Sequence, residues 1–323
     1  MTDSGPMVSL LSLDPASYEP HEVHSGERSY HETNCYSDIL IELLHARGDE
    51  PLAAMGFIVR LDFEGDQWTF FKPDPADLQH LFGIDIHEMQ PYRDLPTQVA
   101  EQIAGGRTMT IELDSMYLPD TEATAYRTEH VKTSVVVESI DRENERLRYF
   151  HNASLHELSG EDYRGVFRKG EFADPAALPP YTELIRFDAG PRLSGDELRA
   201  AALEATRHHL AHRPATNPFE RFASRLAEDL PRLLEGDDEE YHAYAFATVR
   251  MAGSAFEILA SHVEWLLGAE GEPAAAAMGR IVDGCKVLSF KLARRKPFDP
   301  EPAMADLAAA WDEAMRLLDD AVA

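Results

Sequence analysis

The spacing of hydrophobic positions changes along the chain near residue 190. Before that point, short runs rich in β-branched and aromatic residues predict strands. These strands are expected at 57–63, 68–71, 108–113, 131–137 and 147–150. Apolar residues at helical spacing predict helices at 35–47, 77–82 and 95–104 in the same region. The mixture indicates an α+β domain.

Beyond residue 190 the pattern is helical throughout. Helix starts are predicted at Ser194 and at Asn217-Pro218, and long amphipathic stretches rich in Ala and Leu follow. Those stretches span 245–267, 274–294 and 302–322. We therefore expect three parts: an extended, poorly packed segment at 1–28, an α+β domain at 29–190 and a helical bundle at 191–323.

Cys35, His130 and Asn152 are the candidate catalytic residues. Cys35 is predicted to open a helix, where unpaired backbone N–H groups and the helix dipole favour a thiolate and hold a developing oxyanion. Asn34 is a possible further oxyanion donor. His130 precedes a predicted strand, and the next strand ends at His151 and Asn152. In a hairpin these ends lie together, so either residue is a candidate to orient His130 as a base.

The loop between the third strand and His130 carries candidate substrate-cleft residues. They are Asp114, Tyr117, Asp120, Tyr126 and Arg127. Loop tyrosines also serve in packing, a cysteine at a helix start is often only a small buried hydrophobe, and a histidine before a strand is often a surface residue. No histidine or cysteine set has a standard zinc spacing, so no metal is expected.

Composition and charge narrow the class of partner. The formal net charge is −28, which argues against nucleic acid. No apolar run is long enough to cross a bilayer, and two cysteines without a leader-like start indicate a reduced, cytoplasmic protein. One basic stretch stands apart and suggests docking of an acidic partner, or else a solvated helix face. Its residues are Lys286, Lys291, Arg294, Arg295 and Lys296.

Several long motifs resemble the bacterial family called domain of unknown function 1839. They are the runs 34–38, 62–72, 117–121, 130–133 and 149–153, and the resemblance covers nearly the whole chain, including Trp265 and 286–294. The chain also distantly resembles the N-terminal, papain-like acyltransferase domain of butirosin biosynthesis protein H. Papain-like peptidases place a glutamine about six residues before the nucleophile, whereas Ser29 and Tyr30 stand in that stretch here.

These resemblances imply aminoacyl transfer. The donor would be the phosphopantetheine thioester of an acidic acyl or aminoacyl carrier protein, and the acceptor a small-molecule or peptide amine, with no cofactor bound to the chain itself. Cys35 would be the nucleophile, His130 the base and Asn152 the orienting group. Two alternatives stay open: a cysteine peptidase or amidase that uses the same residues, and a non-catalytic module that binds a carrier protein.

Overall fold

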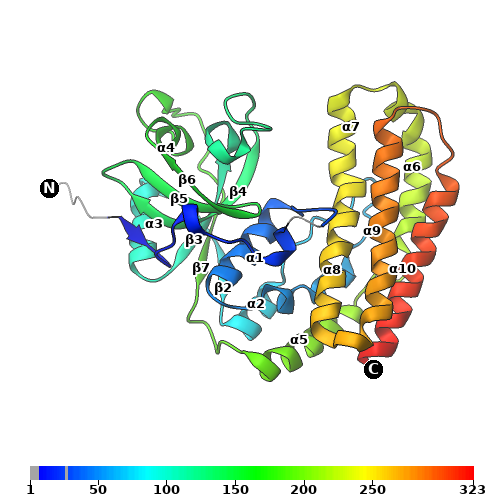
Figure 1. Ribbon diagram of the computed structural model, residues 1–323. Helices are drawn as coiled ribbons and strands as arrows, with labels where there is room; N and C mark the ends of the chain where they lie inside the picture. Colours follow the sequence, from blue (N-terminus) through cyan, green and yellow to red (C-terminus); the bar gives the residue numbers. More distant parts are fainter. Residues whose placement is uncertain (1–6, 26–27) are drawn as a thin grey trace. The chain divides into compact units, whose positions relative to one another are not determined.

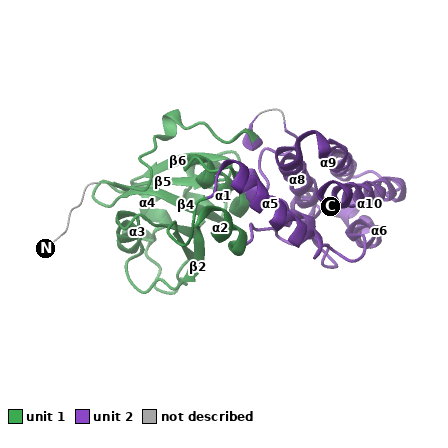
Figure 2. Ribbon diagram, turned by 90° about the horizontal axis from the view of Figure 1, so that it is seen from below, with its two compact units in different colours: residues 1–22, 35–51, 75–192 green, residues 23–34, 52–74, 193–323 purple. Residues whose placement is uncertain are grey.

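The computed structural model describes residues 7–25 and 28–323, and it is α+β (Figure 1). The chain divides into two compact units, which Figure 2 colours separately. Unit 1 comprises Met1–Glu22, Cys35–Pro51 and Pro75–Arg192, and unit 2 comprises Val23–Asn34, Leu52–Asp74 and Leu193–Ala323. The expected domain at 29–190 is therefore not continuous, because two of its segments group with the helical unit.

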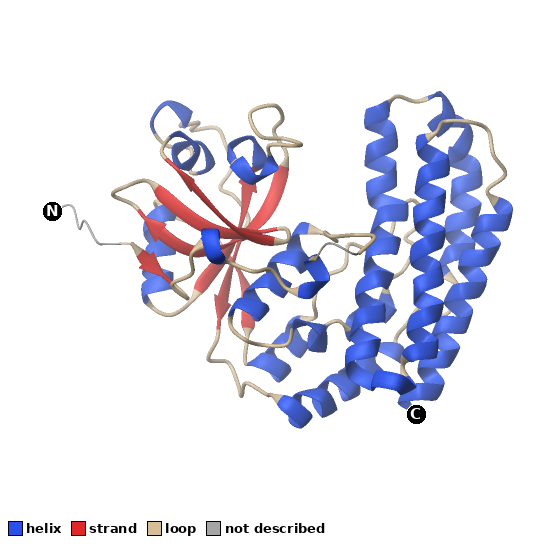
Figure 3. Cartoon of the chain, in the orientation of Figure 1, coloured by secondary structure: helices blue, strands red, loops and turns tan. Residues whose placement is uncertain are grey.

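Unit 1 is built on an antiparallel sheet (Figure 3). Among the described residues seven strands form it in the order β2-β7-β3-β4-β5-β6, with β1 paired to the far end of β4. The strands are β1 (Val8–Ser9), β2 (Asp85–Met89), β3 (Thr108–Asp114), β4 (Lys132–Asp141), β5 (Arg146–His151), β6 (Ser154–Ser159) and β7 (Thr182–Arg186). The expected strands at 108–113, 131–137 and 147–150 are all present.

The two faces of the sheet are covered by different helices. Met109, Ile111 and Val135 belong to one hydrophobic core with residues of α3 (Leu95–Ala104) and α4 (Glu161–Val166). Side chains alternate across a strand, so Thr110 and Val136 face the other way. Helix α1 (Cys35–Ala46) covers that second face, and α2 (Pro75–Phe82) completes the helices of unit 1.

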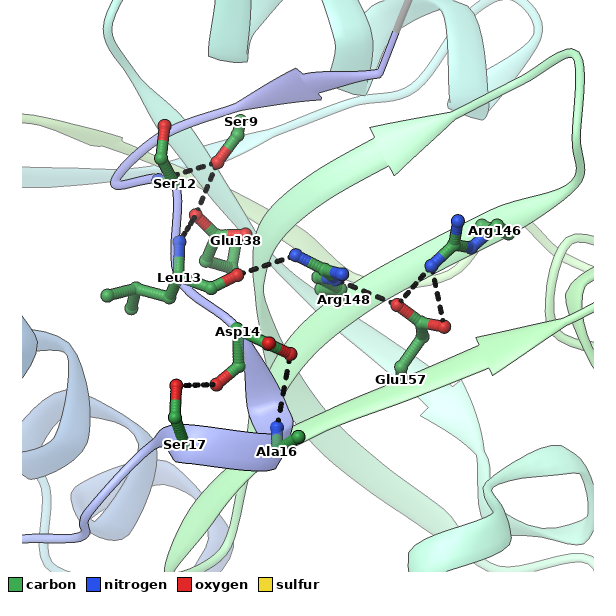
Figure 4. Close-up of polar contacts among 10 residues, drawn as sticks. All are labelled: Ser9, Ser12, Leu13, Asp14, Ala16, Ser17, Glu138, Arg146, Arg148 and Glu157. Atoms are coloured by element: carbon green, nitrogen blue, oxygen red, sulfur yellow. Dashed lines mark hydrogen bonds and ion pairs between the residues drawn. The ribbon is translucent and has the colours of Figure 1, made fainter.

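The segment before α1 is packed rather than loose. Glu138 on β4 is fully buried, and its Oε1 accepts hydrogen bonds from Ser9 Oγ (2.6 Å) and the Leu13 amide (3.4 Å) (Figure 4). Arg148 on β5 donates to the Leu13 carbonyl at 2.6 Å. The prediction of a poorly packed segment at 1–28 is wrong for its described part, because buried groups of the sheet bind its backbone. Residues 1–6 and 26–27 lie outside the described residues.

Unit 2 contains the predicted helical bundle, with α9 packed between α8 and α10. Its helices are α5 (Gly195–Leu210), α6 (Pro218–Glu235), α7 (Asp238–Ala245), α8 (Met251–Leu267), α9 (Glu272–Ala293) and α10 (Glu301–Val322). A π-helical turn over Phe246–Arg250 joins α7 to α8. No helix among the described residues is long and apolar enough to cross a membrane.

The hairpin predicted at 57–63 and 68–71 does not form. Gly56–Arg60 is a 3-10 helix, and a single bridge between Phe63 and Trp68 is all that remains of strand pairing among these residues. The cause is burial of successive residues: Gly56, Phe57, Ile58 and Val59 are all buried. A half-exposed strand alternates buried and exposed positions, so this apolar run does not fit one.

Candidate functional site

A cleft of about 670 Å³ lies in unit 1 where β3 ends and β4 begins. Charged, polar and aromatic side chains share its lining with aliphatic ones. The polar and charged members are Glu112, Asp114, Tyr117, His130, Lys132, Arg168, Asp174 and Tyr181. Phe167 and Phe172 add aromatic surface. Concave sites of this size with a few converging polar groups are the usual places for small ligands.

His130 is held in this cleft by a carboxylate. Its Nδ1 donates a hydrogen bond to Asp114 Oδ2 at 2.6 Å. The register of β3 and β4 explains the pair, because Asp114 lies opposite Lys132, two residues after His130. Lys132 in turn bonds Glu112 at 2.7 Å. A histidine whose Nδ1 is bound to a carboxylate has Nε2 left for proton transfer, which suits a general base.

Cys35 is the first residue of α1 and is partly exposed. The next residue, Tyr36, donates its hydroxyl to Glu183 of β7 at 2.7 Å. Tyr181, which lines the cleft, donates to the other oxygen of Glu183 at 2.9 Å. Burial, together with Glu183, raises the pKa of both tyrosines, to about 12 for Tyr181. They therefore stay protonated and tie the first turn of α1 to the wall of the cleft.

The structure does not bring Asn152 or His151 to His130. Val136 lies opposite Phe150, which puts His151 level with Val135. His130 lies five residues before Val135, about 16 Å in extended chain. The prediction that His151 or Asn152 orients His130 is therefore wrong, and Asp114 holds that position. Among the described residues, Cys35 makes no hydrogen bond to His130 or to Asn152, so their catalytic roles stay predictions.

The candidate cleft residues separate into two groups. Asp114 and Tyr117 line the cleft as predicted. Asp120, Tyr126 and Arg127 do not line it, and the prediction is wrong for these three. Tyr126 donates to Asp162 at 3.1 Å, and Arg127 forms ion pairs with Glu161 and Asp162. Both side chains are thus bound to the first turn of α4.

Asp120 belongs to a buried polar network on the sheet face that α3 and α4 cover. Its carboxylate accepts from His151 Nδ1 and, at 2.5 Å, from the Tyr149 hydroxyl. His151 Nε2 lies 2.8 Å from Thr133 Oγ1. Burial alone would raise the pKa of Asp120, but the bonds from His151 and Tyr149 and the nearby His156 outweigh it, so the pKa is lowered. The network holds the loop before His130 against β5.

Two other candidate groups have partners of their own. The Asn34 side-chain amide donates to the Phe71 carbonyl at 3.1 Å, so this N–H is not free for an oxyanion. In the basic stretch, Arg295 bonds Asp238 and the Gly236 carbonyl. Lys291 lies 5.6 Å from the centre of the Phe298 ring. Lys286 and Arg294 are exposed.

The two cysteines should differ sharply in reactivity. Cys285 is fully buried in α9, and burial raises the pKa of its thiol to about 12. We expect iodoacetamide at pH 7.5 to add one group to the folded chain, at Cys35, and a second only after denaturation. Intact mass and peptide mapping measure this, with Cys35→Ala as the control. Alkylation of Cys285 in the folded protein would contradict the burial of that helix face.

Sequence reasoning missed Asp114 as the partner of His130 and missed Tyr36, Glu183 and Tyr181 altogether. A signal for Asp114 was present: strands 108–113 and 131–137 are adjacent in the chain, and antiparallel pairing puts the end of the first beside the start of the second. Glu183 lay outside every predicted strand, in a stretch that gave no clear strand signal.

Comparison with family models gives two matches in series. The DUF1839 N-terminal domain matches residues 19–187, and the DUF1839 C-terminal domain matches residues 195–320. The gap between them coincides with the boundary between β7 and α5. No curated protein matches the chain. Because the two models span nearly all of it, the chain belongs to the DUF1839 family.

Proposed function

We propose that this protein is a cysteine-dependent aminoacyltransferase whose unit 1 is papain-like. It would take an aminoacyl group from the phosphopantetheine thioester of an acidic carrier protein and pass it to an amine. One observation carries the proposal: Tyr36 and Tyr181 share Glu183, which links the first turn of the Cys35 helix to the cleft that holds His130 and Asp114. This link supports the proposal that Cys35 and His130 act on one substrate, as nucleophile and base.

In the first step the Cys35 thiolate attacks the carbonyl carbon of the donor thioester. The new bond joins Cys35 Sγ to the acyl carbon, and the bond to the phosphopantetheine sulfur breaks, releasing that thiolate. Backbone N–H groups of the first turn of α1 favour the negative charge on both sulfur and oxyanion. Exchange of one thioester for another is nearly isoenergetic, so the protein has mainly to align the two groups.

In the second step an amine in the cleft attacks the Cys35 thioester. His130 Nε2 takes a proton from the amine as the new C–N bond forms and the C–S bond breaks, which returns Cys35 to its thiolate. Asp114 stabilises the imidazolium through Nδ1. The aromatic side chains of Tyr117 and Phe172 suit an acceptor with an apolar body.

A thioester as the acyl donor suits a site with few hydrogen-bond donors for the oxyanion. The Asn34 side-chain amide uses one N–H on the Phe71 carbonyl, and we assign the oxyanion to backbone N–H groups at the start of α1. A thioester is already activated and needs less oxyanion stabilisation than a peptide bond. This favours transfer from a thioester over hydrolysis of an amide.

The test is to trap the acyl-enzyme. Wild-type protein, Cys35→Ala and Cys285→Ala are incubated with an aminoacyl thioester of N-acetylcysteamine and quenched in acid, and intact mass is recorded. We expect one aminoacyl adduct on wild type and on Cys285→Ala, and none on Cys35→Ala. An equal adduct on Cys35→Ala would refute the proposal. Release of free amino acid at the same rate with and without an amine acceptor would identify a hydrolase instead.

A further inference from the structure

Helix α9 exposes an apolar and basic stripe on the face turned away from its neighbours in the bundle. Its residues are Lys286, Val287, Phe290 and Arg294, spaced one, three and four apart, so they share one side of the helix. Phe290 is 64% exposed and Val287 is 52% exposed. Cys285, Leu288 and Leu292 on the opposite side are buried. We call these four exposed residues the α9 stripe.

Of the five residues in the basic stretch, only Arg295 forms an ion pair within the described part of the chain. Arg295 is neutralised by Asp238, and Lys291 lies beside the Phe298 ring. Within the described part of the chain, neither Lys286 nor Arg294 forms an ion pair. The Arg294 guanidinium lies 5.6 Å from the centre of the Phe290 ring, and the Lys286 ammonium lies 3.5 Å from the Ser29 hydroxyl. Two unneutralised cations therefore flank an exposed aromatic ring.

We propose that the α9 stripe docks an acidic, amphipathic helix of the carrier protein that delivers the thioester. This rests on the proposed function. Phe290 and Val287 would be desolvated against the apolar side of that helix, while Lys286 and Arg294 pair with its carboxylates. The formal net charge of −28 makes the stripe a local reversal of the surface charge. The same charge opposes a second copy of this chain as the occupant.

Binding is measured by titration calorimetry with the apo form of an acidic bacterial acyl carrier protein. Phe290→Ala should weaken binding at least about tenfold, because a central aromatic contact is lost. Lys286→Glu with Arg294→Glu should weaken it about a hundredfold at low salt, because attraction becomes repulsion. The control is Arg280→Glu with Arg316→Glu, which makes the same change in net charge on exposed positions of α9 and α10. It should bind like wild type.

Three results would overturn this inference. One is equal binding by wild type and the Lys286/Arg294 double variant, and another is equal loss in the Arg280/Arg316 control. The third is a wild-type dimer in sedimentation analysis that Phe290→Ala converts to a monomer, since a second copy would then occupy the stripe. Phe290 and the two cations are exposed, so the melting temperatures should match that of wild type.

Failure of the proposed function would give a result that differs from failure of the docking proposal. If Cys35 is not the nucleophile, Cys35→Ala and wild type behave alike toward the N-acetylcysteamine thioester, while calorimetry still reports on the stripe. If both proposals hold, the double variant should lose transfer from the carrier-bound donor about as strongly as it loses binding. Its transfer from the small thioester should stay unchanged, because that donor needs no docking surface.

Discussion

Asp114→Asn should greatly lower the rate of aminoacyl transfer. A general base contributes about 10²- to 10⁴-fold to the rate, and most of that contribution should be lost. Asp114 accepts the Nδ1 proton of His130 at 2.6 Å and would stabilise the imidazolium formed when His130 takes the proton of the amine. Asparagine keeps an oxygen for the Met116 amide, which Asp114 now caps at 3.1 Å, so the loop should survive the change. The steady-state rate with a small thioester donor and a primary amine measures the effect.

The control for Asp114 is Asn152, the residue that the sequence alone favoured. Asn152 has a φ of 48°, so Asn152→Gly is the substitution that keeps its backbone relaxed. This variant should retain transfer close to wild type, and His130→Ala should lose at least as much as Asp114→Asn. A large loss in Asn152→Gly with full activity in Asp114→Asn would show that the hydrogen bond to Asp114 has no catalytic part.

The first turn of α1 and the β4–β5 pair could be predicted because their signals are local. The apolar run after Cys35 and the turn at Gly48 fix that helix in the sequence, and the β-branched run 131–137 fixes the strand. The structure gives Gly48 a φ of 74°, as a helix end of this kind requires. Such features depend on neighbours within a few residues, so one sequence is enough to read them.

The partner of His130 could not be predicted in the same way. It depends on whether the start of β4 pairs with β3 or with β5. From the sequence, His130 was expected beside the end of β5, whereas β4 lies between β3 and β5 and pairs with both. His130 precedes the part of β4 that pairs with β5 and remains level with the end of β3. Register across a sheet is a tertiary property, and a shift of a few residues moves the partner by 10 Å or more.

In unit 2 as well, the helices could be predicted from local sequence, but the contacts of individual side chains could not. The positions of α9 and α10 followed from amphipathic spacing to within two residues at each end. The five basic residues between Lys286 and Lys296 looked equivalent in the sequence, yet only some are available to a partner. Arg295 is bound to Asp238, whereas Lys286 and Arg294 flank exposed apolar groups. Neighbouring elements decide which charges of a basic stretch remain open.

Asp120→Ala should destabilise the fold by about 2 to 6 kcal/mol, because two buried donors lose their acceptor and each costs about 1 to 3 kcal/mol when left unsatisfied. His151 is 2% exposed and Tyr149 is fully buried, so both would lose their acceptor with no water to replace it. Urea unfolding followed by circular dichroism gives the free energy of unfolding. Glu122→Ala, an exposed carboxylate two residues later in the chain, is the control and should stay within about 0.5 kcal/mol of wild type.

The same network predicts how this difference depends on pH. The pKa of Asp120 is lower in the folded protein than its ordinary value, because His151, Tyr149 and His156 outweigh the opposing effect of burial. A carboxyl with a lowered pKa stabilises the fold above its unfolded pKa of about 3.9, and this contribution is lost as the pH falls through the folded value. The stability gap between wild type and Asp120→Ala should thus shrink as the pH falls below about 4. A gap that does not change with pH would mean that the loss in Asp120→Ala comes from packing rather than from the charge of the carboxylate.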